Sequence, residues 1–149
     1  MIKTKLLSSG KTIIWLFLAS FLMFHTTSCS KKIIFMNSAV APAATGDIQI
    51  KTDKNNNQSI KINIANLAEP GRLTPPKQMY MVWMETDQAE IKNLGQIKTS
   101  DGTFSKALKA SFQTVTTFKP VKIFITAEDD ANALYPNYVR VLTTEVFNN

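Results

Sequence analysis

Isoleucine at every second position is the feature that most restricts what this chain can fold into. It occupies alternate positions from Ile60 to Ile64, and Ile48 and Ile50 alternate with polar residues in the same way. A period of two places such side chains on one face of a β-strand. Residues 53–57 between the two runs read DKNNN, which has the composition of a turn. The sequence therefore predicts a hairpin with one buried face.

The chain after Gly46 predicts further strands. Met79–Met84 is apolar or aromatic at every position, which is typical of a central strand covered on both faces. Phe104–Phe112 fits helical and strand spacing alike, and we assign it to a strand because its surroundings are β-rich. One strand or a pair of strands is expected at Ala89–Thr99, with a bulge at Gly95. Further strands are expected at Val115–Phe118, at Val121–Ala127 and at Tyr138–Phe147. These seven or eight strands predict an all-β domain over residues 46–149, an immunoglobulin-like antiparallel β-sandwich that requires no helix.

The first 28 residues predict a secretory signal peptide. Lys3, Lys5 and Lys11 form a basic start, and the apolar run Ile13–Phe24 follows. A helix of these 12 residues would be about 18 Å long, well short of the ~30 Å hydrocarbon core of a bilayer. The run therefore fits the hydrophobic region of a signal peptide spanning residues 1–28 better than a transmembrane helix.

The single cysteine of the chain, Cys29, directly follows the small residues Thr27 and Ser28. This segment resembles the lipobox of bacterial lipoproteins, although Thr26 stands where leucine is common. The resemblance implies that the Cys29 sulfur carries a diacylglyceryl group and that cleavage occurs on its amino side. Cleavage elsewhere, which would leave a soluble secreted protein with a free thiol, and an uncleaved membrane anchor remain as alternatives.

Residues 29–45 predict a lipidated start and a tether between membrane and domain. Small residues and Pro42 are typical of such a spacer, but Ile33–Met36 would also suit a first, edge strand, and the sequence leaves both interpretations open. Lys31 and Lys32 would lie at the lipid headgroups. Ser30 replaces the aspartate that the best-known sorting rule associates with the inner membrane. We therefore expect a location in the cell envelope, on the periplasmic side of the outer membrane.

The formal charge of +6 does not indicate nucleic-acid binding. Five of the lysines belong to the signal peptide or to the two positions beside the anchor. From Ile33 onward, 12 basic and 11 acidic residues leave a charge of about +1. The two signs are interspersed along the sequence, as on an ordinary solvated surface, and we expect no nucleic-acid partner.

Several strand and turn residues follow a recognisable pattern. It consists of Tyr80-x-Val82-Trp83-Met84, Leu94-Gly95, Asp101-Gly102, Phe118-x-x-Val121-x-Ile123, Glu128 and a loop at Pro136. The pattern resembles the C-terminal extracytoplasmic domain of anti-sigma-K factors, which implies an immunoglobulin-like sandwich outside the membrane. The sigma-binding domain and transmembrane helix of that family have no counterpart in this sequence, so no sigma factor is expected as a partner. The chain is also similar to small lipoproteins without an assigned role, which share its Trp83–Thr86 and Ile125–Asp130 stretches.

The sequence offers little for catalysis or metal binding. The only histidine, His25, lies in the predicted signal peptide, and Cys29 is expected to be acylated. Nucleophilic sites that pair histidine with serine or cysteine are thereby excluded, and only carboxylates remain for a metal. Glu128, Asp129 and Asp130 are weak candidates for a hard cation such as Ca²⁺, although neighbouring acids occur more often in solvated loops. We expect no cofactor and no enzymatic activity.

Aromatic residues supply the candidates for a binding surface. Phe124 alternates out of phase with Ile123 and Ile125, so it should lie on the opposite face of its strand, and Tyr135 and Tyr138 lie in or beside the loop at Pro136. Trp83 is expected in the core, since sandwiches of this type often bury one tryptophan.

These features predict a lipid-anchored binding, structural or sensory module whose partner is the membrane and an envelope protein or glycan. One alternative is a calcium-dependent or carbohydrate-binding domain that uses residues 128–136. A second is a small hydrolase that uses the carboxylates of Glu85, Asp87 or Glu128.

Overall fold

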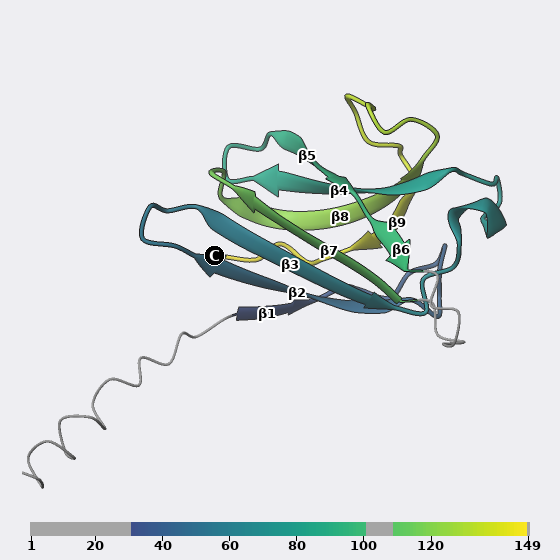
Figure 1. Cartoon of the computed structure of the whole chain (residues 1–149), viewed down its shortest axis with the longest axis horizontal. Helices are drawn as coiled ribbons and strands as arrows, with labels where there is room; N and C mark the ends of the chain where they lie inside the picture. Colours follow the sequence, from purple (N-terminus) through teal and green to yellow (C-terminus); the bar gives the residue numbers. More distant parts are fainter. Residues whose placement is uncertain (1–30, 101–108, 149) are drawn as a thin grey trace, which may run out of the picture.

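The computed structural model describes residues 31–100 and 109–148, which form two antiparallel β-sheets (Figure 1). The five-stranded sheet has the order β1-β2-β3-β7-β6, and the four-stranded sheet has the order β5-β4-β8-β9. The strands are β1 (Lys31–Ile34), β2 (Thr45–Thr52), β3 (Gln58–Ala65), β4 (Met79–Thr86), β5 (Ile91–Gln96), β6 (Lys98–Ser100), β7 (Lys109–Thr116), β8 (Pro120–Glu128) and β9 (Arg140–Thr143). The one helical element in this part of the chain is a 3₁₀ turn, η2 (Pro70–Arg72).

This architecture confirms the predicted all-β sandwich. Without β1, the strand orders are β2-β3-β7-β6 and β5-β4-β8-β9, which is the A-B-E-D and C′-C-F-G arrangement of immunoglobulin-like domains. The nine described strands exceed the predicted seven or eight. They include β1, which the sequence left open between tether and edge strand, and β5 and β6, which form the pair considered for Ala89–Thr99.

The predicted isoleucine hairpin is confirmed as β2 and β3. Ile48 pairs with Ile62 and Ile50 with Ile60, and all four side chains are buried. The polar residues between them point outward, because neighbouring side chains on a strand alternate between its two faces.

Asp53 organises the turn of this hairpin. Its carboxylate accepts hydrogen bonds from the side-chain amide of Asn57 at 2.9 Å and from the backbone N–H groups of Asn57 and Asn55 at 2.9 and 2.7 Å. These hydrogen bonds, the one from the Asn57 side chain foremost, hold the pKa of Asp53 below its usual value. Asn56 takes a positive φ of 62°, a conformation that asparagine tolerates well in turns.

The segment Ile33–Met36, for which tether and edge strand were both open, belongs to the sheet. β1 pairs with β2 from Lys31–Ile50 to Ile34–Asp47. Phe35 then forms a bridge to Thr144 beside β9, and the backbone N–H of Met36 donates to the carbonyl oxygen of Thr143 at 2.8 Å. The chain therefore crosses from one sheet to the other immediately after β1.

Residues 37–45, part of the segment expected to be a tether, also pack onto the sandwich. Ala41 and Ala44 are buried in the core, and the Ser38 hydroxyl accepts a hydrogen bond from the backbone N–H of Ala41 at 2.9 Å. Burial of apolar side chains and satisfied backbone groups hold this stretch against the domain. Cys29 and the predicted signal peptide lie outside the described residues.

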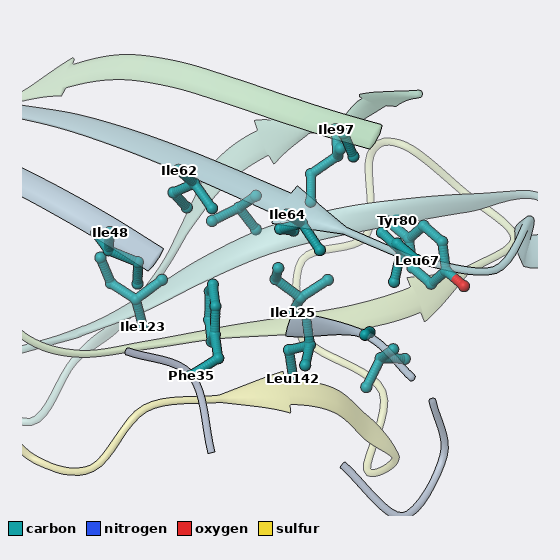
Figure 2. Packing of buried hydrophobic residues seen from close by; sticks show 14 of the residues in the cluster. Phe35, Ile48, Ile62, Ile64, Leu67, Tyr80, Ile97, Ile123, Ile125 and Leu142 are labelled. Carbon is teal, nitrogen blue, oxygen red and sulfur yellow. The ribbon is translucent and has the colours of Figure 1, made fainter. Parts of the chain in front are cut away.

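The core lies between the two sheets and takes side chains from both (Figure 2). Strand β4, predicted to be central and covered on both faces, is confirmed as such: Tyr80 and Val82 face this core, whereas Trp83 is buried on the opposite face. The Tyr80 hydroxyl donates a hydrogen bond to the carbonyl oxygen of Ala68 at 2.9 Å. Burial raises the pKa of Tyr80 to about 12.

The bulge predicted at Gly95 is confirmed on β5. Val82 of β4 pairs with Gly95, and the next residue, Trp83, pairs with Asn93, so Leu94 is the extra residue. Gly95 has a φ of 127°, which a residue with a side chain adopts only under strain.

Three other predicted strands differ from the structure. The strand expected at Val115–Phe118 is not separate, because Val115 and Thr116 form the end of β7 and the next two residues lie outside any strand. The last strand was expected over Tyr138–Phe147, but β9 covers only Arg140–Thr143 because Tyr138 and Val139 remain in the preceding loop. Of the strand expected at Phe104–Phe112, residues 109–112 belong to β7 and the remainder lies outside the described residues.

Candidate functional site

The two ends of the sandwich have different roles in the path of the chain. β1 begins at Lys31, which pairs with Ile50 close to the β2–β3 turn, so the described chain enters at that end. The opposite end carries the connections of residues 37–44, 66–78 and 129–139, and the loop 129–139 rises beyond the four-stranded sheet (Figure 1). In immunoglobulin-like domains such end loops commonly carry the binding residues.

The loop 129–139 exposes most of its large apolar and aromatic side chains. Leu134 and Tyr135 have exposed fractions of 85% and 84%, Tyr138 is fully exposed, and Val139 is more than half exposed. We call these four residues the distal loop surface. The two tyrosines proposed from the sequence as binding residues thus belong to one loop and are open to solvent, each next in sequence to an exposed aliphatic residue.

Phe124, the third aromatic candidate, lies beneath this loop and is fully buried. It does occupy the face of β8 opposite to the core, as its phase predicts, where it packs with Met81 and Trp83. Ala133 of the loop packs against this cluster, and the guanidinium carbon of Arg140 lies 4.4 Å from the centre of the Phe124 ring. Phe124 therefore supports the loop and is not available to stack on a ligand.

Trp83 is buried, but on the outer face of the four-stranded sheet and not between the sheets. Its indole N–H donates to the Thr126 hydroxyl oxygen at 2.8 Å, and that hydroxyl donates to the Glu128 carboxylate at 2.5 Å. The same carboxylate oxygen accepts the backbone N–H of Asn137 at 2.8 Å. A buried polar chain thus connects the centre of β4 to the far side of the loop.

This network was not anticipated from the sequence, although a signal for it exists. Thr126 and Glu128 follow Phe124 at intervals of two, so all three share the outer face of β8. Polar residues on the same face as a buried phenylalanine, and across from a tryptophan, indicate that a loop covers this face of the sheet and is held there by hydrogen bonds.

Further contacts hold the loop at both sides. The Lys77 ammonium lies 2.6 Å from the Asp129 carboxylate, which connects the loop to residues 66–78. The Asn93 side-chain amide of β5 donates to the carbonyl oxygen of Ala133 at 3.3 Å. Between β5 and residues 131–134 lies a groove of about 560 Å³, bordered at its rim by Leu134. The loop is therefore fixed at its base, while its apolar side chains remain free to contact a partner.

The three carboxylates proposed as weak metal ligands do not converge. Glu128 is bound by Thr126 and Asn137 on the outer face of β8. Asp129 pairs with Lys77, and Asp130 accepts the backbone N–H of Asn132 at 2.8 Å. Within the described ranges, no group of three or more histidine, cysteine, aspartate or glutamate side chains is arranged to hold a metal ion.

The carboxylates considered for hydrolysis are separated as well. Glu128 pairs with Met79 at one end of β4, whereas Glu85 lies six residues further along the same strand and Asp87 follows its end. At a rise of about 3.3 Å per residue, Glu85 and Glu128 are roughly 20 Å apart along the sheet. They do not face one another across a common cleft.

Comparison with known proteins adds no precedent for this surface. No protein-family model, no curated protein and no solved structure matches the chain. In residues 31–100 and 109–148, no helix is long and apolar enough to cross a membrane. The similarity to the anti-sigma-K extracytoplasmic domain stays an expectation from the residues quoted above.

Proposed function

We propose that this protein is a lipid-anchored, non-catalytic binding module of the bacterial cell envelope, which presents the distal loop surface to an envelope protein. The observation that carries the proposal is the position of this surface. The described chain enters the sandwich at one end, and the exposed tyrosines lie at the other. A partner can therefore reach them while the N-terminus is held elsewhere.

The construction of the loop supports this role. Exposed apolar and aromatic side chains on a monomer commonly mark an interaction site, and tyrosine contributes a large contact area at a low entropic cost. The loop that carries them is held by the Glu128 carboxylate and by the Lys77–Asp129 ion pair. Binding to a loop that is already ordered avoids much of the entropy cost of association.

The lipid anchor is supported by the sequence around Cys29. Only Ser30 separates this cysteine from Lys31, the first residue of β1. Metabolic labelling with a clickable palmitate analogue should mark the wild-type protein and not the Cys29→Ala variant, which should also leave the membrane fraction. Equal labelling of both proteins would refute the anchor.

Photo-crosslinking in intact cells tests the binding surface. A photoreactive amino acid in place of Tyr138 should yield a defined envelope-protein adduct, whereas the same replacement of Lys54, an exposed residue of the β2–β3 turn, should not. Thr126→Val, which loosens the base of the loop, should lower the yield at position 138. Equal yields at both positions, or no adduct at position 138, would overturn the proposed surface.

A further inference from the structure

The outer face of the five-stranded sheet is basic, although the domain as a whole is nearly neutral. Its outward side chains alternate with the buried isoleucines of β2 and β3 and with Ile33 and Ala110 of β1 and β7. Among the described side chains, the charged ones on this face are Lys32, Lys51, Lys61, Lys109 and a single carboxylate, Asp47. The remaining described side chains from Ile33 onward carry an excess of acids. The charges that alternate along the sequence are therefore separated in space.

The one carboxylate of this face does not neutralise it. Asp47 has one oxygen 3.7 Å from the Lys32 ammonium, and its other oxygen is buried without a hydrogen bond among the described atoms. Lys51 and Lys61 are exposed, and no carboxylate of the described residues lies within ion-pair distance of either. Their positive charges are thus available to a negatively charged surface.

The outer face of the five-stranded sheet is open and suits contact with a membrane surface. The other outward positions carry amides and hydroxyls, among them Gln49, Asn63 and Ser111, together with two exposed aliphatic side chains, Ile34 and Val115. A shallow hollow of about 610 Å³ lies over β1, β2, β3 and β7, with Lys32 and Lys109 at its border. An open face that carries several lysines and one carboxylate is complementary in charge to anionic lipid headgroups.

The position of the anchor brings this face close to a membrane. β1 is the edge strand of the same sheet, and Ser30 alone separates Lys31 from the cysteine proposed to carry the lipid. Two residues of extended chain span at most about 7 Å. The edge of the basic sheet is therefore held within reach of the headgroups, at a distance comparable to the Debye length of ~8 Å at physiological ionic strength.

We propose that the outer face of the five-stranded sheet lies against the anionic phospholipid headgroups of the membrane that the N-terminal lipid enters. This inference rests on the proposed lipid anchor and specifies the orientation of the anchored domain. The domain lies on its side, and the loop 129–139, which rises beyond the four-stranded sheet, faces away from the membrane (Figure 1). The basic face can then contact the membrane while the distal loop surface binds an envelope protein.

Energy transfer from single labels to a headgroup-labelled lipid tests this orientation. The mature lipoprotein is placed on vesicles of phosphatidylcholine alone or mixed with phosphatidylglycerol, with a donor at Gln113→Cys on the basic face or at Gln96→Cys on the outer face of the other sheet. On anionic vesicles, transfer from position 113 should be several-fold greater than transfer from position 96. The difference should shrink on neutral vesicles and at high salt.

Charge-reversed variants test whether Lys51 and Lys61 orient the domain on anionic vesicles. Lys51→Glu with Lys61→Glu should remove the difference between the two labels on anionic vesicles. Lys119→Glu with Lys122→Glu is an equal change of charge, in the connection before β8 and on the outer face of β8, and should preserve the difference. Equal transfer from both labels in the parent protein, greater transfer from position 96, or indifference to the Lys51 and Lys61 reversals would overturn the proposal.

The experiments distinguish a failure of the proposed lipid anchor from a failure of the proposed contact between the basic face and the membrane. Because the chain has a single cysteine, a wild-type protein that accepts the thiol label and does not float with neutral vesicles would refute lipidation. Binding of that protein to anionic vesicles, lost on reversal of Lys51 and Lys61, would still support the basic face. Absence of binding to both kinds of vesicle would overturn both proposals, while crosslinking at position 138 reports on the loop independently.

Discussion

The two outer faces of the sandwich differ in nearly every respect. The face of the four-stranded sheet buries Met81, Trp83 and Phe124 beneath the loop 129–139 and Arg140. The face of the five-stranded sheet carries lysine and amide side chains and remains open. The difference follows from the strands themselves: β4 and β8 are apolar at both phases, whereas β2 and β3 alternate. An outer face that is apolar needs a cover, and here the cover is the loop that presents the candidate binding residues.

Trp83→Ala should cause the largest loss of stability. It tests whether the covered face of the four-stranded sheet stabilises the fold as a second hydrophobic core. Truncation of a fully buried tryptophan is expected to lower the free energy of unfolding by about 3–5 kcal/mol. Gln113→Ala on the open face is the matched control and should change it by less than about 0.5 kcal/mol. Chemical denaturation measures both. Similar losses of unfolding free energy for the two variants would mean that the covered face stabilises the fold no more than the open face does.

Thr126→Val tests the polar part of the cover at nearly constant volume. It leaves the Trp83 indole N–H and the Glu128 carboxylate without their shared partner, and we expect a loss of about 1–3 kcal/mol. Hydrogen exchange at the Asn137 amide should accelerate more than exchange in the β2–β3 hairpin. If protection at Asn137 were unchanged, the network would not be what holds the loop.

Tyr80→Phe compares the covered face with the interior, because Tyr80 and Trp83 lie on opposite faces of β4. Loss of the hydrogen bond to Ala68 should cost about 1 kcal/mol at neutral pH. Since burial raises the folded-state pKa of Tyr80 from 10.0 to about 12, its contribution is complete below pH 10 and is lost as the pH rises towards 12. Denaturation across this interval should show a steeper decline for the wild type than for the variant. Parallel curves would contradict this assignment.

Reversal of Lys51 and Lys61 should have the smallest effect on stability. Both side chains are exposed and without an ion-pair partner among the described residues, so the free energy of unfolding should change by less than about 0.5 kcal/mol. A thermal melt of the double variant against the parent checks this. A large loss of stability would show that the open face contributes to the fold, and the vesicle measurements on this variant would then need a different reversal.

The sequence predicted the parts of the fold that depend on local periodicity. The Ile48–Ile64 hairpin, the doubly covered β4 and the bulge at Gly95 each follow from a run of residues whose pattern repeats over a single strand. The opposite-face position of Phe124 was predictable for the same reason. Strand β1 was left open between tether and edge strand, because a segment of four residues is too short to show a clear alternation.

Properties that depend on how strands are placed relative to one another were not predictable. Trp83 is buried as predicted, but the cluster that buries it lies on the outer face of the four-stranded sheet, which the sequence interpretation did not specify. The basic face escaped notice because lysines on different strands become neighbours only through the register of β1, β2, β3 and β7. Phe124 is buried whereas Tyr135 and Tyr138 are exposed. This difference depends on where the loop 129–139 folds back over the sheet, which the sequence alone does not determine.

The antiparallel pairing of β1 with β2 also determines how the domain resists mechanical force. A pull applied at Tyr135 or Tyr138 and resisted at Lys31 has a component along the strand direction, because these points lie at opposite ends of the sandwich. The interstrand hydrogen bonds are perpendicular to that direction, so the load acts on the whole ladder in shear and does not open it one bond at a time. The bridge from Phe35 to Thr144 shares this load with the second sheet. A module built in this way is suited to hold a partner under tension.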